Sequence, residues 1–144
     1  MKIFRTLFKP KRMPVQDVRH PSLGTLMFSA DAEAWQVSVA TGTSTVILSV
    51  VGEYEPEPAA LARAANLPAE LPALLAQLPR LLEDSAARIP EIASDIRALT
   101  LDEIVVSGPD VNKAMVWLSG PHAPGDEWHC VWDGQRLTDL GFDG

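Results

Sequence analysis

The chain has 144 residues, of which 47% are hydrophobic and 22% charged, so we expect one folded globular domain. Its single cysteine, Cys130, excludes an intramolecular disulfide framework and a cysteine-based zinc site. No stretch reaches the roughly 18 apolar residues that a membrane-spanning helix needs. The opening MKIFRTLFKPKR has neither the apolar core nor the cleavage site of a secretory signal. These features predict a cytoplasmic protein.

The net charge of −7 is divided unevenly along the chain. Residues 1–12 contain five basic residues and no acid, which gives +5. The remaining residues contain seven basic and 19 acidic side chains, which gives −12. Such a body argues against a nucleic-acid-binding surface, because phosphate contacts need clustered lysine and arginine. It is compatible with a basic protein partner, although acidic surfaces also serve solubility alone.

Residues 1–22 are expected to form a basic tail ahead of a single domain at 23–144. Prolines at 10, 14 and 21 each remove a backbone donor and favour extended geometry in the preceding residue. Four apolar side chains of the tail would share one face of a helix: Ile3, Phe4, Leu7 and Phe8. With the basic residues beside them, they form a minimal amphipathic segment of the kind that contacts membranes or partners.

Three strands are predicted near residues 24–29, 33–39 and 45–51. In the second, Trp35, Val37 and Val39 alternate with polar residues, which is typical of a half-buried strand. The third is apolar on both faces, which indicates a central position. Short connections make the three an antiparallel meander.

Residues 58–99 form a helical block. Pro58 suits a first helical turn, and this helix is expected to end near Asn66, which can cap the next one. Beyond it, apolar residues keep one helical phase from residue 71 to residue 99, so one side is expected to be buried, including Leu75, Leu78, Leu82, Ile89 and Ile96. The prolines at 72, 79 and 90 point in nearly one direction, so their kinks should add into a bow. The block is predicted to be one curved arm, or two to three short helices laid end to end.

Further strands are expected near residues 103–107, 112–119 and 127–132. Asp133-Gly134 then predicts a tight hairpin, because both turn residues need positive φ. The fold class is therefore α+β, with antiparallel N-terminal and C-terminal meanders packed on the central helical block. One continuous sheet is favoured over two, because the helical arm has one strong apolar stripe.

Signatures of catalysis are weak. His122 and His129 have no matched second pair of metal ligands, and on a strand His129 points away from Cys130. Cys130 is expected to be a small buried hydrophobe that shares a face with Trp128 and Trp132. No serine-nucleophile context and no glycine-rich phosphate loop is present. We therefore assign no catalytic residue, metal ligand or cofactor, and an enzymatic role is not favoured.

Two groups of residues are candidates for binding. The four tryptophans at 35, 117, 128 and 132 are expected to pack in the core, with an exposed aromatic surface as the alternative. Glu53, Glu55 and Glu57 form the most concentrated acidic stretch, and Pro56 and Pro58 restrict its conformation. These three carboxylates are the predicted binding residues for a basic partner; otherwise they only solvate a loop.

The run His20-Pro21-Ser22-Leu23-Gly24-Thr25-Leu26, together with Trp35 and the closing Asp133-Gly134 turn, resembles uncharacterised bacterial α+β domain families. Their opening strand follows a P-x-[LF]-G-x-[LF] pattern, and some members are immunity-like. The resemblance implies a non-enzymatic protein-binding domain. Two alternatives remain: a small-molecule-binding or enzymatic domain with a pocket lined by tryptophan and carboxylate, and a membrane-peripheral accessory protein that uses residues 1–12. The sequence leaves the oligomeric state open.

Overall fold

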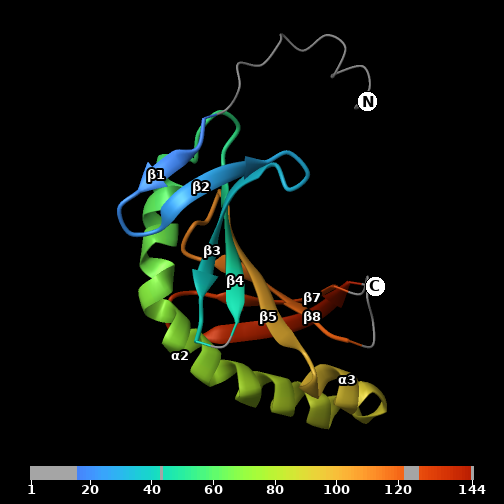
Figure 1. The fold of residues 1–144 in the computed structure, drawn as a ribbon. Helices are drawn as coiled ribbons and strands as arrows, with labels where there is room; N and C mark the ends of the chain where they lie inside the picture. Colours follow the sequence, from blue (N-terminus) through green and yellow to red (C-terminus); the bar gives the residue numbers. More distant parts are fainter. Residues whose placement is uncertain (1–15, 43, 122–126, 144) are drawn as a thin grey trace, which may run out of the picture.

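The computed structural model describes residues 16–42, 44–121 and 127–143, and within them eight strands form one sheet in chain order (Figure 1). The strands are β1 (Val18–His20), β2 (Gly24–Ser29), β3 (Ala34–Ala40), β4 (Thr45–Val51), β5 (Thr100–Val106), β6 (Ala114–Ser119), β7 (Glu127–Trp132) and β8 (Leu137–Asp143). Between β4 and β5 lie α2 (Pro58–Arg88), the 3-10 turn η1 (Pro90–Ile92) and α3 (Ala93–Arg97). The predicted α+β class and the single sheet are confirmed.

The sheet consists of two antiparallel meanders joined by one parallel pair. Strands β1 to β4 form the first meander and β5 to β8 the second. β4 and β5 pair in parallel, with Leu48 beside Ile104 and Val50 beside Val106. A parallel neighbour needs a long crossover connection, and the helical block provides it.

The first strand, β1, lies inside the range that the sequence analysis placed in the tail. Val18 pairs with Leu26 of β2, so the sheet begins before residue 23. Residues 1–15 lie outside the described residues.

Helix α2 is continuous across the point where the sequence predicted an end. The expected stop near Asn66 is wrong, because Pro68, Pro72 and Pro79 all lie inside one 31-residue helix. At ~100° per residue these prolines point within about 40° of one another, so their kinks add. Figure 1 shows the resulting bow of α2 around the sheet. Of the two predicted forms of the arm, the curved one is observed as far as Arg88.

The helical phase breaks at Ile89, which the sequence analysis expected to be buried. Ile89 adopts φ −129° and ψ 74°, and its side chain is 41% exposed. The residue before a proline is pushed out of the helical region, and Pro90 follows. α3 then restores the stripe, with Ile96 fully buried.

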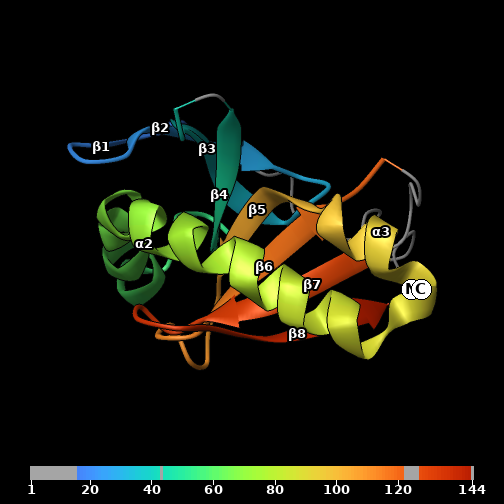
Figure 2. The ribbon, with the colours of Figure 1, turned by 90° about the horizontal axis from the view of Figure 1, so that it is seen from below.

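The core lies between the helices and one face of the sheet. Figure 2 shows α2 and α3 lying across the same side of the strands. On that side, Leu48, Ile104 and Val116 are in register on β4, β5 and β6, and all are inaccessible to solvent. The helix meets them with a stripe of buried residues: Ala60, Ala64, Leu67, Leu71, Leu74, Leu78, Leu82, Ser85 and Ala86.

Candidate functional site

The face of the sheet that points away from the helices combines apolar, aromatic and polar side chains. Strand alternation and the pairing register place them in two rows across the sheet. One row contains Ser38, Ile47, Glu103, Trp117, His129 and Gly141, and the other contains Met27, Gln36, Ser49, Val105, Met115 and Val131. We call this surface the open face. Most of its central side chains are half-buried rather than covered.

A carboxylate is held in place on the open face. Glu103 of β5 accepts hydrogen bonds at Oε2 from Ser49 Oγ and, at 3.3 Å, from Gln36 Nε2. Gln36 Nε2 also lies 2.9 Å from Ser49 Oγ, which ties the two donors together. Among the described residues, Glu103 Oε1 accepts no hydrogen bond. The carboxylate is thus oriented, with one oxygen available to a cation or a donor.

An aromatic pair lies next to this carboxylate. Trp117 is the cross-strand neighbour of both Glu103 and His129. The Trp117 and His129 rings meet edge to face, with centroids 5.2 Å apart and an interplanar angle of 66°. The imidazole lies over Gly141, where an added Cβ would be 3.1 Å from His129 Cε1. Gly141 therefore makes room for this ring on the sheet surface.

The tryptophan prediction is confirmed at three positions and fails at one. Trp35, Trp128 and Trp132 are buried, whereas Trp117 is half-buried on the open face. The cause is alternation within β6, which turns Val116 and Leu118 toward the helices and Trp117 away from them. Five consecutive apolar residues in β6 hide this alternation in the sequence.

The predicted acidic residues lie elsewhere. Glu53, Glu55 and Glu57 are exposed in the loop that joins β4 to α2. This loop turns at Gly52, where φ is +157° and an added Cβ would be 2.0 Å from the Glu55 carbonyl oxygen. Trp35 Nε1 donates to the Gly52 carbonyl at 3.1 Å, which fixes the start of the loop to the core. The three carboxylates are brought to one loop, but they are not part of the open face.

Cys130 occupies the position that the alternation predicted. It is fully buried with Trp128 and Trp132, while His129 lies on the opposite face. Burial raises the pKa of the Cys130 thiol to about 12, so at neutral pH the thiolate that a nucleophile needs is scarce. Its expected role as a small core hydrophobe is confirmed.

Only some of the candidate metal ligands lie among the described residues. His122 and Asp126 lie outside the described residues. In the segments that the structure describes, no group of three His, Cys, Asp or Glu side chains could hold a metal ion. No helix in the same segments is long and apolar enough to cross a membrane.

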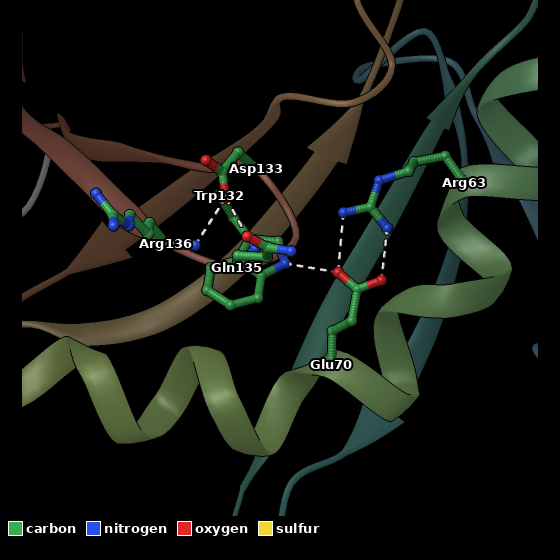
Figure 3. Close-up of polar contacts among 6 residues, drawn as sticks. All are labelled: Arg63, Glu70, Trp132, Asp133, Gln135 and Arg136. Carbon is green, nitrogen blue, oxygen red and sulfur yellow. Dashed lines mark hydrogen bonds and ion pairs between the residues drawn. The ribbon is translucent and has the colours of Figure 1, made fainter.

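A second polar cluster joins α2 to the β7–β8 hairpin (Figure 3). Arg63 donates two hydrogen bonds to Glu70, at 2.8 and 2.9 Å, and Trp132 Nε1 donates a third to Glu70 Oε1 at 2.8 Å. In the hairpin, Asp133 Oδ1 accepts from the backbone N–H groups of Gln135 and Arg136, at 2.8 and 2.7 Å. These bonds connect groups of the chain to one another, so the cluster holds the helix against the hairpin. The predicted hairpin at Asp133-Gly134 is confirmed, but not as a tight two-residue turn. Its loop runs from Asp133 to Arg136, and of the two turn residues only Gly134 has a positive φ, at +99°.

A shallow hollow lies at the β2–β4 end of the open face. It has a volume of about 270 Å³ and is lined by Thr25, Met27, Phe28, Ser29, Gln36, Val37, Ser38 and Ile47. Neither tryptophan nor a carboxylate is among these residues. The hollow is therefore not the tryptophan and carboxylate pocket of the alternative prediction.

Comparisons with protein-family models, with curated proteins and with solved structures return no match to this chain. The resemblance drawn from residues 20–26 and from Asp133-Gly134 therefore stays a prediction. The surface that stands out by its own chemistry is the open face, centred on Glu103 and Trp117.

Proposed function

We propose that this protein is a non-enzymatic protein-binding domain whose partner docks on the open face. The observation that carries the proposal is the adjacency of an accessible tryptophan and an oriented carboxylate on central strands. Tryptophan is the residue most enriched at the energetic centres of protein interfaces, and a rigid sheet presents it without an ordering cost. An immunity-like role, in which the bound partner is neutralised, is the form that the resemblance implies.

The chemistry of the open face favours a basic partner. Glu103 and Trp117 are directly paired on β5 and β6, so one cation of a partner would lie close to both side chains. An arginine or lysine of the partner would gain a charge-assisted hydrogen bond and a cation–π contact there. The charge of −12 on residues 13–144 would speed the approach of such a partner.

The alternative is a small-molecule or enzymatic site, and the same adjacency of Glu103 and Trp117 is the observation in its favour. Small-molecule sites are usually concave and enclose most of their ligand. Glu103 and Trp117 lie on the sheet surface, outside the 270 Å³ hollow. This arrangement suits a flat contact with protein better than enclosure of a small ligand.

The test begins with isolation of the partner from source cells by the tagged protein, followed by purification of both. Calorimetry then compares the wild type with Trp117→Ala. Loss of a central tryptophan should weaken binding by about 2 kcal/mol, roughly 30-fold. Ile89→Ala, an exposed apolar residue on the helical side, is the matched control and should bind as the wild type does. Equal affinities for wild type and Trp117→Ala, or turnover of a small molecule that depends on Glu103, would contradict the proposal.

A further inference from the structure

The N-terminal segment of this chain has the chemistry that the open face would bind. Residues 1–12 contain five cations and no acid. Their four apolar residues, Ile3, Phe4, Leu7 and Phe8, would lie on one face of a helix. A short basic amphipathic segment matches a surface that offers apolar side chains around an oriented carboxylate.

The receiving surface has matching parts. Met115, Val105 and Val131 neighbour one another across β5, β6 and β7 and are half-buried, so apolar area there is available for contact. Glu103 lies among them with its Oε1 accepting no hydrogen bond from the described residues. Within the described strands, the lysine or arginine on this side is Arg19, which lies at the far edge on β1, and exposed Lys113 directly precedes β6. The centre of the face thus favours a cation.

The chain is long enough to connect the segment to this surface. The described chain begins next to β1, which is the edge strand of the sheet. Five strand spacings of ~4.8 Å place β6 roughly 24 Å from β1. Residues 9–17 can span up to ~30 Å when extended, so Phe8 can reach the surface around Trp117.

We infer that residues 1–12 dock on the open face of their own chain and cover Glu103 and Trp117 until a partner displaces them. The inference rests on the proposed function in so far as the partner uses the same face. Intramolecular docking lowers the partner's apparent affinity, because only molecules in which the face is free can bind. The apparent dissociation constant is the intrinsic one divided by the fraction of such molecules. A segment that occupies the face 90% of the time would weaken partner binding about tenfold.

A nitroxide spin label tests the docking in the full-length protein. Thr6→Cys introduces the label without changing a charge or an apolar residue of the segment, and the buried Cys130 should stay unlabelled. Docking should broaden the NMR signals of Val105, Met115 and Val131, and should leave those of Ala76 on the outer side of α2 sharp. Phe4→Ser with Phe8→Ser, or Glu103→Gln alone, should remove the broadening. The matched control Lys11→Ser should largely retain it.

Two outcomes overturn the inference. One is the absence of broadening on the open face, or broadening confined to β1 and β2. The other is broadening that occurs only between spin-labelled and isotope-labelled molecules in a mixed sample, because that places the segment on a second copy.

Partner affinity separates this inference from the proposed function. If Phe4→Ser with Phe8→Ser leaves partner affinity unchanged while Trp117→Ala weakens it, the inference fails and the proposed function stands. If the label reports docking but Trp117→Ala leaves partner affinity unchanged, the proposed function fails and the docking stands.

Discussion

Glu70 is the residue whose ionisation is most closely tied to the fold. Burial raises the pKa of its carboxyl group, but the hydrogen bonds from Arg63 and Trp132 and the charge of Arg63 outweigh burial and lower the pKa below 4.5. A lowered pKa in the folded state means that ionised Glu70 stabilises the fold above the unfolded pKa. This contribution is lost as the pH falls through the folded pKa.

We therefore expect Glu70→Gln to lower the free energy of unfolding by about 2 kcal/mol at pH 7, because it removes charge-assisted hydrogen bonds and leaves Arg63 unpaired. Urea denaturation at several pH values would measure this, and the gap from the wild type should close at acidic pH. Glu83→Gln breaks the exposed pair with Arg97 and should change stability little. A gap between wild type and Glu70→Gln that is constant with pH would contradict the account.

Ser85, unlike Glu70, is a buried polar residue whose side chain lacks a hydrogen-bond partner among the described residues. It lies within α2, and the unbonded atom is its Oγ. Ser85→Ala removes a desolvated hydroxyl and improves helix propensity, so it should raise the free energy of unfolding by about 1 kcal/mol. The control is Ser49→Ala, which removes a buried hydroxyl bonded to Glu103 and should destabilise. Chemical denaturation of both variants decides the point, and a loss of stability in Ser85→Ala would show that the hydroxyl has a partner.

At the level of elements, α2 ends between two apolar residues, and we expect their substitution by alanine to change the free energy of unfolding by very different amounts. Leu82 is 6% exposed in the stripe of α2, and Ile89 is 41% exposed just beyond its end. Leu82→Ala should cost about 2–5 kcal/mol, because it removes buried contacts and leaves a cavity. Ile89→Ala should cost about 0.5 kcal/mol, as exposed substitutions do. If thermal or urea unfolding shows that the two variants lose similar amounts of stability, the buried stripe continues through Ile89.

The prolines inside α2 allow a second test at this scale. Pro79 is exposed and deprives the Leu75 carbonyl of its helical hydrogen bond. Restoring that bond is worth more than the ~1 kcal/mol of unfolded-chain entropy that proline removes, so Pro79→Ala should stabilise by about 1 kcal/mol. Pro58→Ala, at the first helical position, should show no such gain. A Pro79→Ala variant that is less stable than the wild type would mean that the bow is needed for contact with the sheet.

Periodicity and turn chemistry predicted most elements of this fold. Alternation located β3 and β7, and Asp133-Gly134 located the last hairpin, because these signals depend on neighbours within a few residues. The continuity of α2 could not be predicted this way, since a proline is a local helix breaker and only packing on the sheet outweighs it. The candidate site was harder to predict from the sequence than the fold. Strand pairing brings Gln36, Ser49 and Glu103 together from three strands, and no sequence pattern links positions so far apart.

The arrangement of the whole molecule explains why one face of the sheet is left without a covering helix. At 1.5 Å per residue, α2 is about 46 Å long and crosses the sheet on one side. Its single apolar stripe can bury only one sheet face. The other face of an antiparallel sheet is normally polar and solvated, yet here it includes Trp117, Met115 and Val131. Apolar and aromatic residues retained on such a face are typical of a binding surface.

Two sets of acids then differ in the step of partner binding that they should control. Glu53, Glu55 and Glu57 are exposed in a loop away from the open face, so they would act by long-range attraction. Reversing all three to lysine should lower the association rate with a basic partner and weaken the dependence of that rate on salt, while the dissociation rate stays nearly constant. Glu103→Gln would remove the direct contact that we propose, and should mainly raise the dissociation rate. Stopped-flow mixing at several salt concentrations would separate the two, with circular dichroism to verify folding. If the triple reversal leaves the association rate unchanged, the acidic loop has no part in binding; if Glu103→Gln leaves dissociation unchanged, the partner does not contact the centre of the open face.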